Sequence, residues 1–303
     1  MSQKGDFNNA LPVISLYVFA GYRLMPALQG VYSSVAQLTF VGPSLNKLHD
    51  DLKNIKLSNV KQDQSDLYFN SSITLNNINY SYPNASRKSL KNISLTIPAK
   101  TTVGIVGTTG SGKTTIVDII LGLLEPQNGT LEVDNMVINQ KNSKTWRKCI
   151  GYVPQHIYLA DDTISANIAF GVDPINIDNN SVEKVSKIAN LHNFVINELP
   201  QKYQTKIGER GVRLSGGQRQ RIGIARALYH NPKVLVFDEA TSALDNDTEK
   251  SVIDAVNNLS KDITIIMIAH RLNTVKICDI IFKIENGELV SEGNFNQIID
   301  KRF

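Results

Sequence analysis

Residues 102–123 read TVGIVGTTGSGKTTIVDIILGL and decide the fold of this chain. Within them, residues 107–114 match the pattern G-x-x-x-x-G-K-[ST] at every fixed position. The apolar run before the glycines predicts a strand over residues 102–106, and the run from Lys113 to Leu123 predicts a helix. A strand, a glycine-rich loop and a helix in this order form a phosphate-binding loop. The alternative is a glycine-rich turn without a ligand, which the complete match disfavours.

The residue types in this loop suit a bound phosphate. Its glycines let the backbone curl so that successive N–H groups face inward, and the following helix adds the positive end of its dipole. Lys113 is predicted to reach the β- and γ-phosphates of a nucleotide, and the Thr114 hydroxyl to ligate Mg²⁺.

A second motif lies at residues 234–239, which read VLVFDE. Four apolar residues predict a buried strand that ends in two acids, at the edge where open α/β sheets bind ligands. Asp238 suits Mg²⁺, usually through water, and Glu239 is placed to orient or deprotonate an attacking water. Many buried strands end in Asp, so this motif indicates a ligand site only in combination with the phosphate loop.

The chain from residue 73 onward predicts alternating strands and helices, and hence a mostly parallel sheet covered by helices. The expected strands are 73–80, 94–97, 102–106, 131–133, 151–153, 234–237 and 263–269, with a hairpin formed by 280–285 and 288–291. The expected helices are 113–123, 181–197, 217–229 and 247–259.

Residues 214–218 read LSGGQ, and they limit further the protein families that fit this sequence. Together with the phosphate loop and the Asp238-Glu239 strand, they make the chain resemble the ATP-binding cassette (ABC) ATPases from residue 73 to the C-terminus. The resemblance implies a P-loop NTPase cassette with a mostly parallel core sheet, an antiparallel β edge and a helical subdomain. It also implies that ATP contacts the loop residues Gly107, Thr108, Thr109, Gly110, Ser111, Gly112, Lys113, Thr114 and Thr115.

Other motifs of the family occur in order, and each carries an implied role. Tyr82 in YSYP matches the aromatic residue that stacks on adenine, and Gln155 in YVPQ matches the glutamine that senses Mg²⁺ and water. His270 in IAHR matches the histidine that contacts the γ-phosphate. In isolation, Tyr82 would be read as a core residue, and Gln155 and His270 as structural side chains. Ser242 and Asp245 match the loop that crosses a dimer interface.

The segment around Ser215 precedes a predicted helix and is therefore a second N-terminal anion site. One ATP cannot occupy two distant helix N-termini in one domain, and the family's solution is a head-to-tail dimer of cassettes. The implied residues that reach the partner's ATP are Leu214, Ser215, Gly216, Gly217 and Gln218. The implied catalytic residues are Glu239, His270, Gln155 and Lys113, and the implied Mg²⁺ ligands are Thr114, Gln155 and Asp238.

Residues 205–211, TKIGERG, and 162–171, DTISANIAFG, resemble segments of exporter-type cassettes. In that family context Glu209 and Arg210 would meet the coupling helices of a membrane domain. From spacing alone they read as a solvated charged pair. The resemblance therefore implies that ATP hydrolysis powers export across a membrane, with the cassette on the cytoplasmic side of an inner or plasma membrane.

The N-terminal segment contains an uncharged run at residues 10–22 and an amphipathic pattern at residues 31–48. It allows a buried core helix, a signal peptide or part of a membrane span. It resembles the last transmembrane helix of an exporter with its cytoplasmic extension, in particular of exporters that flip lipid-linked saccharides. We therefore expect residues 1–48 to be a partial transmembrane domain, 49–72 a linker and 73–303 the nucleotide-binding domain. Arg23 either snorkels to the cytoplasmic surface or pairs with an anionic lipid phosphate.

Exporters of this family carry about six spans, so the expected partners are the missing membrane helices, membrane lipid and a second cassette. The formal net charge of +4 is weak and gives no reason to expect nucleic acid as a partner. Two alternatives stay open. One is a soluble ABC ATPase of DNA repair or chromosome maintenance, which would carry long coiled coils between loop and signature. The other is a regulatory module that binds nucleotide without turnover.

Overall fold

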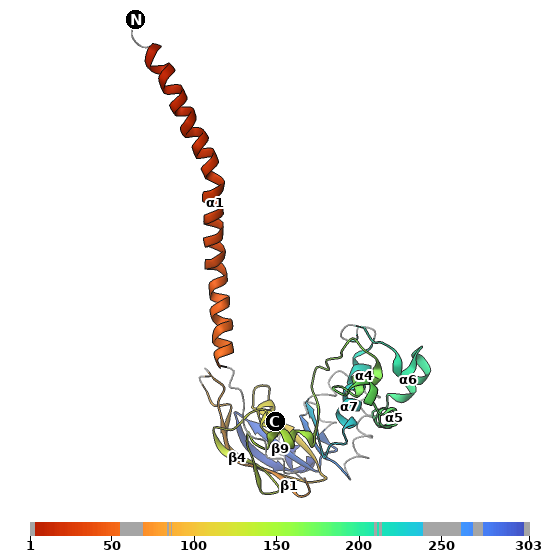
Figure 1. Cartoon of the computed structure of the whole chain (residues 1–303). Coiled ribbons are helices and arrows are strands. Elements are labelled where there is room, and N and C mark those ends of the chain that lie inside the picture. The colour runs from red at the N-terminus through yellow and green to blue at the C-terminus, as the bar shows by residue number, and fades with distance from the viewer. Residues whose placement is uncertain are drawn as a thin grey trace. The chain divides into compact units, whose positions relative to one another are not determined.

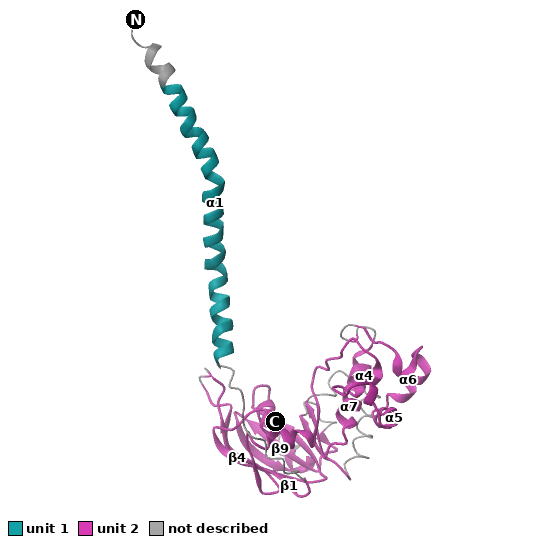
Figure 2. Cartoon of the chain, viewed as in Figure 1, with its two compact units in different colours: residues 1–59 teal, residues 60–303 magenta. Residues whose placement is uncertain are grey.

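The computed structural model describes residues 4–54, 69–83, 85, 87–208, 211, 214–238, 262–268 and 275–299. The chain divides into two compact units, residues 1–59 and residues 60–303 (Figure 2). The first contains one helix, and the second contains two sheets with their covering helices (Figure 1). The expected helix 247–259 lies outside the described residues.

Unit 1 is formed by α1, which runs from Lys4 to Asn54 over 51 residues. At ~1.5 Å per residue such a helix is about 77 Å long. Within the described residues, this helix alone is long and apolar enough, from Ala10 to Lys53, to cross a membrane by length and composition. Helix α1 continues to Asn54, into the segment 49–72 that we expect to be a linker. Polar residues such as Asp50 and Lys53 are compatible with an exposed helix, so polarity alone does not end one.

The larger sheet of unit 2 has six strands in the order β10-β9-β3-β8-β7-β6. Strands β9, β3, β8, β7 and β6 run parallel to one another, and β10 pairs antiparallel with β9 at one edge. This topology confirms the predicted mostly parallel sheet. The strand bounds are β3 Thr102–Val106, β6 Ile150–Val153, β7 Val234–Asp238, β8 Thr264–Ile268, β9 Ile280–Glu285 and β10 Glu288–Gly293.

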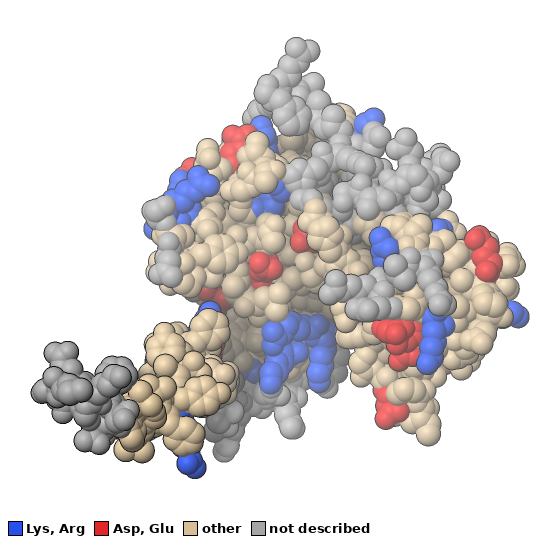
Figure 3. All heavy atoms as spheres, turned by 90° about the horizontal axis from the view of Figure 1, so that it is seen from above, with Lys and Arg blue, Asp and Glu red and all other residues tan. Residues whose placement is uncertain are grey.

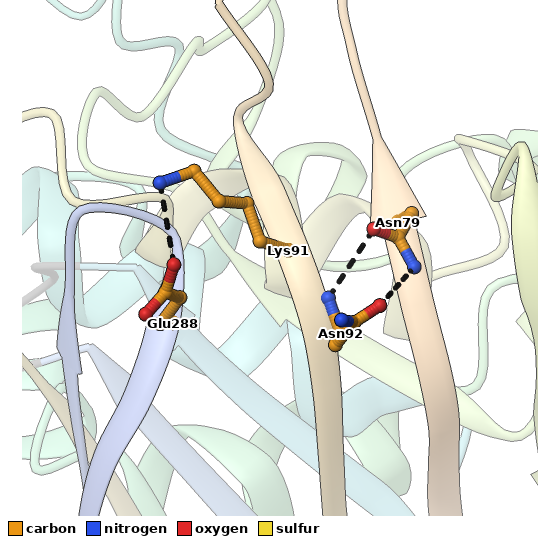
Figure 4. Close-up of polar contacts among 4 residues, drawn as sticks. All are labelled: Asn79, Lys91, Asn92 and Glu288. Atoms are coloured by element: carbon orange, nitrogen blue, oxygen red, sulfur yellow. Dashed lines mark hydrogen bonds and ion pairs between the residues drawn. The ribbon is translucent and has the colours of Figure 1, made fainter.

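The smaller sheet is antiparallel, in the order β2-β1-β4-β5. Its bounds are β1 Ser72–Tyr80, β2 Leu90–Pro98, β4 Asn128–Val133 and β5 Met136–Ile138. Figure 4 shows two of its polar links. The Asn79 amide donates to Asn92 Oδ1 at 2.7 Å across β1 and β2, and Lys91 Nζ donates to Glu288 Oε1 at 3.3 Å, joining β2 to β10. The second link connects the two sheets.

Alternating side chains of the central strands enter two separate cores. Val234 and Val236 of β7 pack with the smaller sheet, while Leu235 and Phe237 pack with the helical part. A strand that is buried on both faces is read from sequence as a continuous apolar run, as 234–237 was. On the face drawn in Figure 3, basic and acidic side chains both occur, and several Lys and Arg side chains gather in one group near the middle of the view.

The helices pack on both faces of the larger sheet. Helix α2 lies in the core shared with the smaller sheet, and α4–α7 form a helical part around the other core. The helix bounds are α2 Lys113–Ile120, α3 Ser143–Lys148, α4 Ile164–Ile168, α5 Asn179–Ile188, α6 His192–Glu198, α7 Gly216–Tyr229 and α10 Phe295–Ile299, with 3-10 turns at Pro174–Asn176 and Lys202–Gln204.

The prediction of one helix over 181–197 is wrong, because the structure has two helices there. Asn190 adopts a left-handed φ of 56° directly after α5. The N–H of Asn190 donates to Lys187 O, and that of Leu191 donates to Ser186 O. These two bonds form the pattern that ends helices with a left-handed residue, and Asn tolerates that conformation.

Candidate nucleotide-binding site

The phosphate loop connects the C-terminal end of β3 to the start of α2, as the sequence predicts. Lys113 is 5% exposed, and its Nζ donates to the carbonyl oxygens of Gly107 and Thr108 at 2.9 Å each. The loop therefore wraps around the ammonium group. The first N–H groups of α2 have no partner within the helix and are available to an anion.

A cavity of about 700 Å³ opens beside this loop, a volume within the usual range for small-molecule sites. Ser111 is 2% exposed, and its hydroxyl has no hydrogen-bond partner in the described part of the chain. An unpartnered buried hydroxyl is costly, and a bound phosphate would satisfy it. The cavity is lined by Tyr82, Arg87, Lys88, Ser89, Lys91, Thr108, Thr109, Gly110, Ser111, Gly112, Lys113, Thr114, Thr115, Asn286 and Gly287.

Tyr82 stands at the rim of this cavity. The residue is 40% exposed, so it is not a core residue, and its hydroxyl lies 3.3 Å from Thr115 Oγ1. The buried Tyr80 ring meets it edge-on, with ring centroids 5.1 Å apart. The ring is thus held in place while a large part of its surface stays open to the solvent or to a ligand.

The turn between β9 and β10 closes the cavity from another side. Gly287 N–H donates to Ser111 O at 3.0 Å, and Lys91 N–H donates to Gly287 O at 2.8 Å. The sequence predicted a turn at Asn286-Gly287 but not its place against the phosphate loop. No local signal in the sequence could have shown it, since the two segments are far apart in the chain.

The parallel strands bring several predicted residues to one edge of the larger sheet. In the pairing of β6 with β7, Val153 lies opposite Phe237. Asp238 is the last residue of β7 and Gln155 follows the end of β6 by two residues, so both lie at neighbouring strand ends. Strand β3, which leads into the phosphate loop, ends at the same edge through its parallel pairing with β8. Open α/β sheets bind ligands at this edge.

Two residues near Asp238 were missed by sequence reasoning. The Tyr152 hydroxyl donates to Asp238 Oδ2 at 3.1 Å. Burial, followed by the charge of Asp238 and this hydrogen bond, raises the pKa of Tyr152, so the hydroxyl stays protonated at neutral pH. Burial and then the charge of Asp238 raise the pKa of the Asp118 carboxyl. For Asp118, the sequence offered one indication of a place near the site: it follows Thr114 by one helical turn.

The donor types at this edge fit a magnesium ion. The Thr114 hydroxyl, the Asp238 carboxylate and the Gln155 amide supply the hard oxygen ligands that Mg²⁺ prefers. Among the described residues, no group of three or more His, Cys, Asp or Glu side chains could hold a metal ion by itself. A cation here would therefore also need the oxygens of a bound phosphate.

The signature residues Leu214–Gln218 do not line the phosphate-loop cavity. They lie at the N-terminus of α7, where Ser215 Oγ accepts from Gln218 N–H at 3.2 Å and Gln218 Oε1 accepts from Ser215 N–H at 2.8 Å. This reciprocal pair is a capping box. Ser215 is exposed, and its hydroxyl hydrogen can still be donated to another molecule.

Several predicted residues lie outside the described part of the chain. They are Glu239, Ser242, Asp245 and His270, together with Glu209 and Arg210.

Comparison with known proteins places these features in a family. Residues 90–242 match the family model described as ABC transporter. The chain is 42% identical over 229 residues to the ATP-dependent lipid A-core flippase of Saccharophagus degradans, covering 76% of this chain and 38% of that protein. It is 36% identical over 299 residues to the heterocyst differentiation ATP-binding protein HepA of Nostoc, covering 96% of this chain and 48% of that protein.

Among solved structures, a bacterial Atm1-family ABC exporter with ATP bound matches with a TM-score of 0.75 and 32% identity, covering 97% of this chain and 50% of that chain. The chain thus spans about half or less of the length of these relatives. Because the family match covers residues 90–242, half of the sequence, and includes both the phosphate loop and the signature, this chain belongs to the ABC transporter family.

Proposed function

We propose that this chain binds ATP and hydrolyses it with Mg²⁺ to ADP and phosphate, as the nucleotide-binding part of an ABC exporter. One observation carries the proposal. The buried Lys113 ammonium is held by loop carbonyls beside a cavity of about 700 Å³. Its fixed charge, the unpartnered Ser111 hydroxyl and the free N–H groups of α2 together favour a polyphosphate ligand.

Different residues of the cavity would contact different parts of the nucleotide. Tyr82 would stack on the adenine ring, because its ring is held by Tyr80 and open on its rim side. The loop from Gly107 to Thr115 would bind the phosphates. Thr114, Asp238 and Gln155 would hold Mg²⁺, whose charge offsets the negative charge that develops on the phosphate oxygens during transfer.

Hydrolysis further requires residues outside the described part of the chain. We assign the water-orienting base to Glu239 and the γ-phosphate contact to His270, on the family resemblance. Leu214–Gln218 do not line the cavity of their own chain, which supports a head-to-tail dimer in which they reach the partner's ATP. Ser242 and Asp245 would lie at that dimer interface.

The coupling to transport rests on the relatives and on α1. The relatives are about twice as long as this chain or longer. We infer that further membrane helices complete the transporter. The helix α1 supports a place in a membrane. We assign the cassette to the cytoplasmic side of an inner or plasma membrane on the family resemblance. The similarity to the lipid A-core flippase of Saccharophagus degradans supports a lipid-linked saccharide as cargo.

Replacing the proposed base tests the enzyme. Glu239→Gln should keep ATP binding and lower turnover by two to four orders of magnitude, the usual contribution of a positioned base, ~10²–10⁴. Lys113→Ala should instead lose ATP binding, since it removes the charge within the loop. ATP binding by equilibrium dialysis and phosphate release would be measured on the full chain in detergent. Wild-type turnover in Glu239→Gln would contradict the assigned base, and ATP binding without any turnover in the wild type would favour a regulatory module.

A further inference from the structure

Three polar groups converge on one face of the larger sheet, at its ligand-binding edge. In the register of β6 with β7, Tyr152 lies opposite Val236. Side chains of a strand alternate between the two faces, so Val236 and Asp238 point to the same face. Val236 belongs to the core that contains α2. Tyr152 and Asp238 therefore lie on the α2 face of the sheet.

The hydrogen bond between Tyr152 and Asp238 joins these two neighbouring strands at their ends. It runs from the Tyr152 hydroxyl to Asp238 Oδ2 over 3.1 Å, and Tyr152 reaches it from the edge strand β6. A bond to one carboxylate oxygen restricts rotation about the last side-chain bond. It thereby sets the direction in which the second oxygen points.

Asp118 places a second acidic side chain near Asp238. It follows Thr114 by four residues on α2, so the two side chains share one face of that helix. The Asp118 carboxyl group interacts electrostatically with Asp238. Two neighbouring carboxylates repel each other, and the hydrogen bond from Tyr152 is one restraint that opposes rotation of the Asp238 carboxylate away from the site.

We propose that Tyr152 is a positioning residue for the divalent cation, holding the Asp238 carboxylate in the orientation that receives Mg²⁺ together with Thr114. The proposal rests on the proposed function, because the cation arrives with the nucleotide. The Tyr152 side chain does not line the cavity beside the phosphate loop. It acts through Asp238, as outer-shell partners of metal ligands do when they orient a ligand and thereby raise its affinity.

The probe is Mn²⁺, whose binding can be followed by electron paramagnetic resonance without any turnover. The full chain in detergent is titrated with Mn²⁺ in the presence of ADP. Tyr152→Phe keeps the ring and removes the hydroxyl, and we expect about tenfold weaker Mn²⁺ binding, the lower end for loss of an outer-shell partner. ATP binding in EDTA should match the wild type, because the phosphate loop is unchanged.

The matched control is Tyr203→Phe. The Tyr203 hydroxyl is also hydrogen-bonded to side chains, with His192 Nδ1 at 2.9 Å, but it lies in the helical part of unit 2. Tyr203→Phe should leave Mn²⁺ affinity at the wild-type value. An equal loss in both variants would overturn the proposal, because it would show a general effect of losing a tyrosine hydroxyl.

A double-mutant cycle separates positioning from a structural role. In the background Asp238→Ala, the cation is still bound by the nucleotide phosphates and Thr114, but Tyr152 has no carboxylate to orient. Tyr152→Phe should then change Mn²⁺ affinity less than twofold, a strong departure from additivity. The same tenfold loss in both backgrounds, which a misfolded edge strand would produce, overturns the proposal. So does wild-type affinity in Tyr152→Phe alone. Absence of nucleotide-dependent Mn²⁺ binding in the wild type would instead overturn the proposed function.

Discussion

Two glycines of the phosphate loop are required for different physical reasons. Gly112 has a φ of 106°, and a Cβ there would lie 2.8 Å from Leu90 Cδ2 and 2.9 Å from Ser89 O. Gly110 has a φ of 77°, but a Cβ there would meet nothing within 4 Å. Both positions disfavour a side chain through the backbone conformation. Only Gly112 also lacks the space for one, because the start of β2 packs directly against it.

This difference predicts unequal costs of substitution. Gly110→Ala should lower the free energy of unfolding by about 1–2 kcal/mol, the cost of a left-handed residue with a Cβ. Gly112→Ala should lower it by about 3 kcal/mol, because overpacking adds a further 1–3 kcal/mol. Urea unfolding can be followed by fluorescence, since the single tryptophan, Trp146, is buried and donates to Ile120 O at the end of α2. Equal losses in the two variants would contradict the packing argument.

At the scale of elements, α7 shows how one residue can serve folding and chemistry together. Ser215 caps the helix through its side-chain oxygen, and Gln218 returns a bond to the Ser215 backbone. In the proposed dimer, the same hydroxyl would donate to the partner's ATP. A substitution that simply deletes the hydroxyl would remove both roles at once.

Ser215→Asp separates these roles, because Asp caps helices as well as Ser but carries no hydroxyl donor and adds a negative charge. Ser215→Ala should cost about 1 kcal/mol and speed hydrogen exchange in the first turn of α7, whereas Ser215→Asp should keep the wild-type exchange rate. Both variants should lose ATP hydrolysis. Exchange measured by mass spectrometry, alongside phosphate release, gives the comparison. Wild-type hydrolysis in Ser215→Asp would contradict the phosphate contact, and unchanged exchange in Ser215→Ala would contradict the cap.

The boundaries of an element were predictable where a local sequence pattern ended. The prediction was wrong where the conformation of a single residue set the boundary. Strand β3 begins and ends as the apolar run predicts. The break between α5 and α6 depends on Asn190 adopting a left-handed conformation within an otherwise helical pattern. Many helices tolerate an Asn, so the presence of Asn190 does not by itself predict that the helix ends there.

At the scale of the whole molecule, the two units differ in what surrounds their apolar side chains. Unit 2 has two cores of buried apolar residues. In α1 the described apolar side chains are exposed, among them Leu16 at 66% and Phe19 at 63%. A long, exposed and apolar helix is expected to be covered by lipid or by other membrane helices.

Charges placed in this helix test that expectation. Leu16→Asp with Phe19→Asp should move the full chain out of the membrane pellet, because each Asp costs roughly 2.5–3.5 kcal/mol at the centre of a span. Leu48→Asp, beyond the uncharged run but within α1, is the control and should leave the chain in the pellet. Fractionation after a carbonate wash gives the measurement. Retention of the double variant would show that residues 10–28 do not cross the membrane.

The phosphate loop, the buried strands of the larger sheet and the start of a helix after Ser215 were predictable from the sequence alone. These features depend on residues close together in the chain, where glycine conformation, apolar periodicity and capping chemistry act locally. The tertiary structure decided three others: the Gly287 turn against Ser111, the Tyr152 bond to Asp238, and the absence of Leu214–Gln218 from the cavity. Each of these joins or separates segments that are distant in sequence. Their placement depends on strand order and register, which local patterns leave undetermined.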